Sequence, residues 1–176
     1  MLFYNITEDN TQSLISQLGY QHPEDLLARN LHYYMQRTSH GSTLSKLVHA
    51  YLAFLIEDYE LSWVLYQESL RSDFLDIQGG TTREGIHLGV MTGTILYFYR
   101  TYAGLDWTGD ILKLSPKLPS GWKETTFNLS FRSIRYYFKI QRDQISIKTN
   151  SDVPQKMSLD QQFITIQPGD WATFSL

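Results

Sequence analysis

The 176-residue sequence contains no cysteine, which excludes disulfide bonds, thiolate metal ligands and cysteine nucleophiles. It also lacks an excess of basic residues, because 15 Lys and Arg are opposed by 18 Asp and Glu, for a formal net charge of −3. Domains that bind nucleic acids carry clustered positive charge, so this balance argues against that class. Charged residues interrupt the longest apolar runs, and a membrane-spanning segment is therefore not expected.

The first residues, Met1 to Tyr4, have neither the basic leader nor the apolar stretch of a signal peptide. We therefore expect a cytoplasmic protein. An apolar segment begins at the first residue, without the polar residues that usually precede a first element. This pattern indicates that Met1 corresponds to an internal methionine of a longer chain.

Aromatic residues are abundant, at 14% of the sequence, and suit either a sugar-binding surface or a bulky core. Apolar residues recur at helical spacing up to about Gly104 and alternate beyond it. The sequence therefore predicts an α+β fold, with helices over residues 1–108 and a small antiparallel β-sandwich over residues 109–176.

The helical pattern predicts five helices: residues 7–18, residues 23–36, one from 42 or 43 to about 55, one from 59 to 74, and one from the Gly-Gly turn to 102. One wide apolar stripe is expected on the third of them, formed by Leu44, Leu47, Val48, Tyr51, Leu52 and Leu55. The expected inner face of the second helix consists of Leu27, Leu31 and Tyr34, and that of the fourth of Leu61, Val64, Leu65 and Leu70. Gly89 and Gly93 are one turn apart and predict the close approach of a neighbouring helix. In the second half, alternating runs at 136–140 and 145–148 flank a turn at 142–144 and predict a hairpin.

The segment from Asp76 to Leu88 carries the most informative pattern for function. Gly80 permits a sharp turn, Thr81 and Glu84 fit a capping box, and His87 is expected one turn inside the helix that follows. The first turn of a helix presents unpaired N–H groups and a partial positive charge, which together suit an anion. The pattern fits an oxyanion or phosphate site, but taken alone it favours a capped helix without a ligand.

A second loop, Arg37 to Ser42, also leads into a helix and offers Ser39, His40, Gly41 and Ser42. Two such helix starts facing one pocket would hold a dianion from both sides. The alternative is a polar loop that only caps its helix.

Other chemistries are poorly supported by the pattern. Adjacent serine and histidine in one loop cannot easily align as a catalytic triad, and the histidines lack metal-ligand spacing. His49 is expected in the core or at its boundary. No carboxylate stands out as a general acid among the candidates Glu57, Asp58, Glu60, Asp76 and Glu84.

Two segments resemble signature motifs of glycoside hydrolase family 65: Arg37-Thr-Ser-His-Gly-Ser-Thr-Leu-Ser45 and Asp76-Ile-Gln-Gly-Gly-Thr-Thr-Arg-Glu-Gly-Ile-His-Leu-Gly89. A third, Leu114 to Trp122, resembles the start of the family's C-terminal β-domain. The resemblance covers essentially the whole chain. It implies the last helices of an (α/α)6 barrel followed by that β-domain.

The resemblance also implies a site and a reaction. Ser39, His40, Gly41 and Ser42 would help form a phosphate site, with Gly80, Thr81 and His87 beside it. Inorganic phosphate would attack an α-linked disaccharide with inversion and release β-glucose 1-phosphate, without a cofactor or metal. Hydrolases of the family use a water-activating carboxylate, which the loop from Arg37 to Ser42 lacks. The family's general-acid glutamate and sugar-binding pairs lie upstream of these motifs and have no counterpart here.

Three hypotheses follow from the missing acid. The chain is the C-terminal fragment or subunit of an inverting disaccharide phosphorylase, inactive alone and complemented by an N-terminal polypeptide. Alternatively, it is a non-catalytic phosphate- or sugar-binding partner subunit. The third hypothesis is a decayed fragment whose exposed apolar faces cause it to form homo-oligomers or aggregates. The sequence does not indicate which disaccharide the complete enzyme would cleave.

Overall fold

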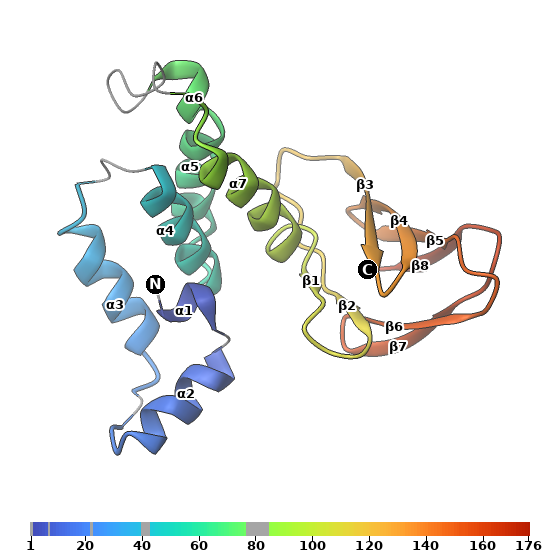
Figure 1. The fold of residues 1–176 in the computed structure, drawn as a ribbon, viewed down its shortest axis with the longest axis horizontal. Helices are drawn as coiled ribbons and strands as arrows, with labels where there is room; N and C mark the ends of the chain where they lie inside the picture. Colours follow the sequence, from blue (N-terminus) through green and yellow to red (C-terminus); the bar gives the residue numbers. More distant parts are fainter. Residues whose placement is uncertain (1, 7, 22, 40–42, 77–84) are drawn as a thin grey trace. The chain divides into compact units, whose positions relative to one another are not determined.

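The computed structural model describes residues 2–6, 8–21, 23–39, 43–76 and 85–176 (Figure 1). The chain forms two compact units, residues 1–97 and 98–176. Helices occupy most of the first unit and strands most of the second, which confirms the predicted α+β class. Within the described ranges, every helix is too short or too polar to cross a membrane.

The helices of the described chain are α1 (Leu2–Asn5), α2 (Glu8–Gln17), α3 (Leu26–Met35), α4 (Thr43–Leu55), α5 (Tyr59–Leu70), α6 (Ser72–Leu75) and α7 (Leu88–Arg100). Asp58 caps α5, because its carboxylate accepts a hydrogen bond from the Leu61 N–H at 3.1 Å. The helix predicted over 59–74 is instead two helices, with Arg71 between them. Left-handed backbone at Asp76, with φ of 45°, ends α6.

The predicted start of the last helix is wrong. Residues 85–87 are not helical, and α7 begins at Leu88, so His87 precedes the helix and is not one turn inside it. Gly85 has a φ of +124°, which is incompatible with helical backbone. The Asp73 carboxylate accepts the His87 N–H at 3.1 Å and so satisfies a donor just ahead of the helix. The predicted capping box at Thr81 and Glu84 lies outside the described residues.

Helix α4 carries the centre of the helical core. Leu47, Val48 and Leu52 of the predicted stripe are buried, whereas Leu44 and Leu55 remain 42% and 39% exposed. A Cβ added at Gly93 would lie 3.2 Å from Leu47 Cδ1, so α7 packs closely on α4 there. A Cβ added at Gly89 would have no atom within 4 Å, so the predicted close approach of a neighbouring helix is confirmed only at Gly93.

A second cluster joins α1, α3 and α4. It consists of Phe3, Leu27, Leu31, Val48, Leu52 and Ala53, all buried. Leu27 and Leu31 are one turn apart on α3 and confirm its predicted inner face. Tyr34, predicted on the same face, is 54% exposed.

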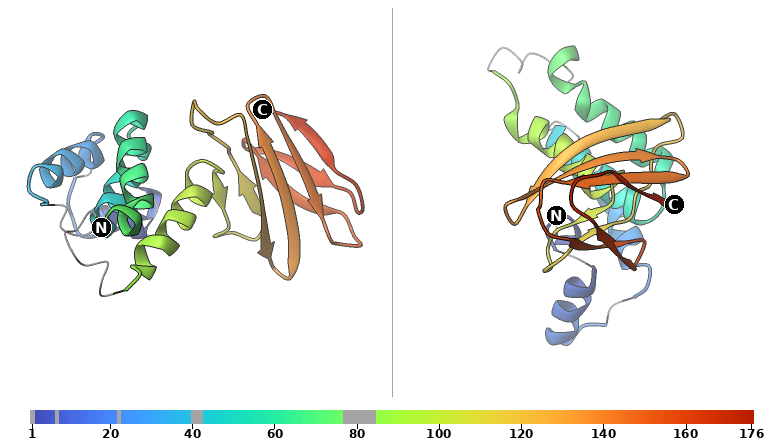
Figure 2. Two further views of the ribbon diagram at one scale, coloured as in Figure 1. Left: turned by 90° about the horizontal axis from the view of Figure 1, so that it is seen from above. Right: turned by 90° about the vertical axis from the view of Figure 1, so that its right-hand side faces the viewer.

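The second unit is a β-sandwich of two four-stranded sheets, ordered β1-β2-β6-β7 and β3-β4-β5-β8. The strands are β1 (Leu105–Asp106), β2 (Leu112–Leu114), β3 (Glu124–Phe131), β4 (Ile134–Gln141), β5 (Gln144–Thr149), β6 (Gln155–Leu159), β7 (Gln162–Ile166) and β8 (Ala172–Ser175). Strands β3, β4 and β5 run side by side in both views of Figure 2. The predicted hairpin is confirmed, since β4 and β5 pair through Ile140 and Ile145.

The sandwich differs from the prediction in one pairing. Strands β2 and β6 are parallel, with Leu112 opposite Met157, so the sandwich is not wholly antiparallel. Parallel neighbours require a long crossover, and here the chain between them forms three strands of the other sheet. Strands β1 and β6 were not predicted, because neither shows clear alternation in the sequence.

The core between the sheets is built from alternating inward residues. Its buried members include Leu112, Leu114, Phe138, Ile140, Ile145, Ile147, Met157 and Ile166. Gly104 enters the unit in left-handed conformation, with φ of 63°, and its backbone lies directly against the Ser115 carbonyl. This contact leaves no room for a side chain.

Candidate functional site

The two predicted anion-binding loops adjoin helices that begin at the same end of the helical unit. Ser62 Oγ on α5 donates to the Ala50 carbonyl on α4 at 2.8 Å and lies 2.5 Å from Tyr97 Oη on α7. Further along α5, Tyr66 Oη donates to the Thr94 carbonyl at 3.3 Å. Helix α5 therefore runs antiparallel to both α4 and α7. The first turns of α4 and α7 consequently lie together, beside the last turn of α5.

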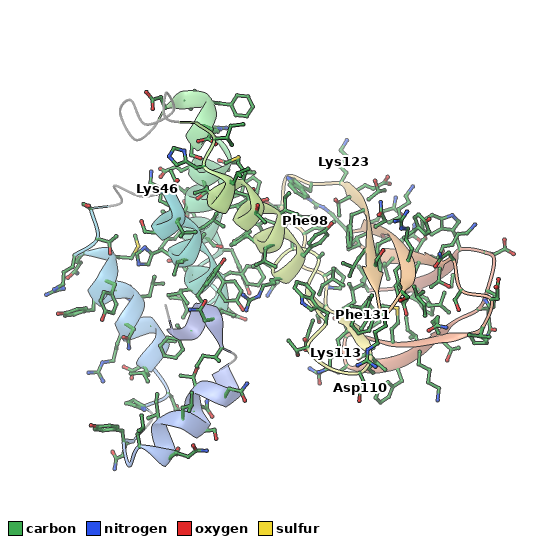
Figure 3. All side chains as sticks on the ribbon, in the orientation of Figure 1. Lys46, Phe98, Asp110, Lys113, Lys123 and Phe131 are labelled. Carbon is green, nitrogen blue, oxygen red and sulfur yellow. The ribbon has the colours of Figure 1, made fainter. Side chains whose placement is uncertain are left out.

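Lys46 lies in the first turn of α4 and is buried, with 9% of its surface exposed (Figure 3). Its Nζ lies 2.8 Å from Glu68 Oε2, near the end of α5. The Glu68 side chain is 44% exposed, so this ion pair opens toward solvent on one side. A buried ammonium needs partners for all three of its donors, and one carboxylate oxygen supplies one of them.

His87, immediately before α7, is held by Asp73 of α6. The imidazole Nδ1 lies 2.5 Å from Asp73 Oδ1, and the His87 backbone N–H donates to Asp73 Oδ2 at 3.1 Å. The Asp73 side chain is 12% exposed and that of His87 30% exposed. Both carboxylate oxygens thus bind one residue, which fixes the ring relative to the start of α7.

The structure describes two of the seven predicted site residues. Ser39 is exposed in the segment between α3 and α4, and His87 is partly buried before α7. Both lie near helix starts at the same end of the unit. The other five, His40, Gly41, Ser42, Gly80 and Thr81, lie outside the described residues.

Two charged residues at this end were not predicted from the sequence. Lys46 directly precedes Leu47 of the apolar stripe on α4, and it is buried there. A lysine beside the apolar face of a helix is unusual, and this position could have been recognised in the sequence. Asp73 had no such signal, because 14 residues separate it from His87 in the sequence. The predicted core position of His49 is confirmed, at 7% exposure.

Two tyrosines pack against each other between α5 and α7. Tyr66 and Tyr97 stack with ring centroids 4.4 Å apart and planes at 20°. Burial, and then the neighbouring Tyr97, raise the pKa of Tyr66 to about 12, so its hydroxyl stays protonated at neutral pH. The described residues form no cluster of three or more His, Asp or Glu suited to a metal ion. The arrangement offers helix N-termini, an ammonium and an imidazole, which are groups that bind oxyanions.

Comparison with known proteins identifies related sequences along nearly the whole chain. Residues 1–96 match the model of the glycosyl hydrolase family 65 central catalytic domain, and residues 105–166 match that of the family's C-terminal domain. A trehalose 6-phosphate phosphorylase of Lactococcus lactis is 34% identical over all 176 residues, which span 23% of that protein. A maltose phosphorylase of Bacillus subtilis is 30% identical over 139 residues, 79% of this chain and 18% of that protein.

The fold also has a counterpart among solved structures. A putative kojibiose phosphorylase from the human microbiome superposes with a TM-score of 0.73 at 22% identity. The match covers 88% of this chain and 22% of the other. The chain therefore spans only 18–23% of the length of these three relatives.

Proposed function

Because the chain belongs to glycosyl hydrolase family 65, we propose that it forms the phosphate-binding side of an inverting α-glucoside phosphorylase. The observation that carries the proposal is the shared orientation of α4 and α7, whose first turns lie together with Lys46 and His87 beside them. Positive helix ends and the Lys46 ammonium suit a phosphate dianion better than a neutral sugar.

In this proposal the helix starts, Ser39, Lys46 and His87 orient the phosphate in the complete enzyme, together with His40, Gly41, Ser42, Gly80 and Thr81. A phosphate oxygen forms the new bond to the anomeric carbon while the bond to the leaving sugar breaks. The leaving oxygen takes its proton from a general-acid glutamate outside this chain, and the product is β-glucose 1-phosphate. Inversion follows from a single displacement, and the donors stabilise charge on the phosphate as it attacks.

The same proposal assigns the two parts of the chain to domains of the complete enzyme. Residues 1–108 would supply the last helices of an (α/α)6 barrel, and residues 109–176 the C-terminal β-domain. The match of residues 1–96 to the family's catalytic domain supports this assignment. A cytoplasmic location remains a prediction from the sequence.

Reconstitution tests the function. The purified chain is assayed for phosphate-dependent cleavage of trehalose 6-phosphate, maltose, trehalose and kojibiose, alone and mixed with a polypeptide carrying the rest of a family 65 catalytic domain. We expect no turnover from the chain alone and phosphorolysis of one α-glucoside by the mixture. Turnover by the chain alone would contradict the missing acid, and hydrolysis without phosphate would contradict phosphorolysis.

A non-catalytic partner subunit is the second candidate, and an apolar cavity favours it. The cavity, of about 640 Å³, lies among α1, α2, α3 and α4 and is lined mainly by apolar residues, including Phe3, Ile15, Leu26, Leu31, Val48 and Leu52. Apolar surface of this kind is typical of an interaction site. Size-exclusion chromatography separates the outcomes: a partner subunit elutes as a monomer until its partner is added, whereas self-association gives a concentration-dependent oligomer.

A further inference from the structure

The geometry points to Asp73 as the positioning residue of His87: it fixes the imidazole tautomer so that Nε2 is directed to accept a hydrogen bond from the P–OH group of hydrogen phosphate. This inference rests on the proposed phosphate site and adds a residue to it. Asp73 would not touch the phosphate. It would act only through His87.

The contacts of Asp73 distinguish it from an ordinary surface carboxylate. Oδ1 lies 2.5 Å from the ring Nδ1 of His87, and Oδ2 accepts the backbone N–H of the same residue at 3.1 Å. The carboxylate therefore binds the ring and the backbone together, and rotation of the ring would break the shorter contact. The Asp73 side chain is only 12% exposed, so water competes weakly for these oxygens.

These contacts determine which ring nitrogen is available to a ligand. An ionised carboxylate is only an acceptor, so the Nδ1 beside it carries the proton. In the described part of the chain, Nε2 of His87 has no hydrogen-bond partner. A fixed Nδ1–H tautomer therefore presents Nε2 in one direction, in the way that a carboxylate orients a catalytic imidazole. The neighbouring ion pair of Lys46 and Glu68 is separate from this contact.

Histidine NMR tests the inference without a ligand. The chain is labelled with ¹⁵N-histidine, the His87 signals are assigned with His87→Gln, and the tautomer is read in the alkaline limit of a pH titration. We expect Nδ1–H in the unsubstituted protein. In Asp73→Asn the amide N–H₂ donates to Nδ1, so the proton should move to Nε2. Asp73→Glu, which keeps a carboxylate, should restore the Nδ1–H form at least in part.

A titration with inorganic phosphate is then followed on the same signals. We expect the dissociation constant to rise at least fivefold in Asp73→Asn, because a protonated Nε2 cannot accept the phosphate P–OH, and to be unchanged in Asp25→Asn. Asp25 is a matched control because it is exposed and, among the described residues, its carboxylate pairs only with Arg29, at 3.9 Å.

Two results would overturn the positioning role: an Nε2–H tautomer in the unsubstituted protein, or an unchanged tautomer in Asp73→Asn. Loss of stability in Asp73→Ala with unaltered phosphate affinity would show a merely structural contact and would also overturn it. Failure of the unsubstituted chain to bind phosphate would overturn the proposed phosphate site. The tautomer measurement needs no phosphate, so it would still support or overturn the assignment of Asp73.

Discussion

At the scale of single residues, two basic side chains at one end of the helical unit are each held by a carboxylate. Lys46 contacts Glu68 at 2.8 Å, and His87 contacts Asp73 at 2.5 Å. Pairing with Glu68 makes it possible to keep the Lys46 ammonium charged in a buried place before an anion arrives. The exposed side of each pair is where a phosphate would enter.

Lys46→Met should weaken phosphate binding by about tenfold, or about 1.4 kcal/mol. The methionine preserves the apolar stem of the buried lysine and removes only its charge. Glu68, at 44% side-chain exposure, remains solvated, so we expect little loss of stability. Calorimetric titration with phosphate measures the change. Glu68→Gln is the control, and it should bind phosphate at least as tightly as the unsubstituted chain; equal affinity in all three proteins would exclude Lys46 from the site.

Gly104→Ala should destabilise the sandwich by about 3 kcal/mol or more. The added Cβ would lie 1.7 Å from the Ser115 carbonyl oxygen, at a φ of +63° that alanine rarely adopts. Urea denaturation monitored by tryptophan fluorescence provides the free energy of unfolding. Gly109→Ala is the matched control, since nothing lies within 4 Å of its Cβ position, and it should change stability by less than about 0.5 kcal/mol.

At the scale of elements, hydrogen bonds between buried polar groups fix the register of the three central helices. Ser62 contacts both the Ala50 carbonyl and Tyr97 Oη and so joins α4, α5 and α7 at one level. The sequence pattern had assigned apolar residues to the inner face of α5. Val64 and Leu70 are exposed there, and Ser62, Tyr66 and Ser69 are buried instead.

Ser62→Ala should lower the stability of the helical unit by about 1–3 kcal/mol, because it removes a partner from two buried polar groups. Thermal unfolding followed by circular dichroism at 222 nm tests this. The control Ser13→Ala removes only an exposed contact with Gln17 and should leave the midpoint nearly unchanged. Equal midpoints for both variants would show that the Ser62 contacts do not hold the three helices.

Asp106, in the short strand β1, makes the stability of the sandwich depend on pH. Burial raises the pKa of Asp106, but hydrogen bonds from Thr108 and the nearby Lys113 ammonium outweigh it and hold the pKa below its usual range. A lowered native pKa favours the charged carboxylate in the folded state. The stabilisation is therefore complete above the unfolded pKa of about 3.9 and is lost as the pH falls through the native value.

Asp106→Asn should remove this part of the acid dependence. Stability measured between pH 6 and pH 2.5 should fall less steeply below pH 4 in this variant than in the unsubstituted protein. Asp110→Asn is the control, because the Asp110 side chain is 93% exposed and its partner Arg132 is also largely exposed. If both variants retain the full slope, Asp106 does not contribute to the acid dependence.

Local patterns predicted most of the elements but not their contacts. Alternation on β4 and β5 was read correctly, because each strand buries every second residue. The stripe on α4 was read only in part, because most of that helix is buried while Leu44 and Leu55 are exposed. The start of α7 was missed because Gly85 has a φ of +124° and because Asp73, 14 residues away, accepts the His87 N–H that helical bonding was expected to satisfy. Lys46 meets Glu68 because α4 and α5 run antiparallel, and Asp73 meets His87 across 14 residues, so spacing along the chain encodes neither contact.

At the scale of the whole molecule, the sandwich has its own core. All of its buried cluster residues lie between Ala103 and Ile166, within the second unit. A fragment of residues 98–176 should therefore fold alone. We expect a β-type circular dichroism spectrum and a cooperative thermal transition, whereas a spectrum without ordered structure would show that the sandwich depends on the helices.

We propose that phosphate binds at the end of the helical unit where α4 and α7 begin. Chemical-shift mapping tests this binding most directly. The ¹⁵N-labelled 176-residue chain is titrated with inorganic phosphate and, separately, with chloride at equal ionic strength. We predict saturable shifts concentrated at residues 39–46 and 85–91 that require phosphate and weaken in His87→Ala. Shifts that do not saturate, that chloride reproduces, or that persist unchanged in His87→Ala would contradict the claim.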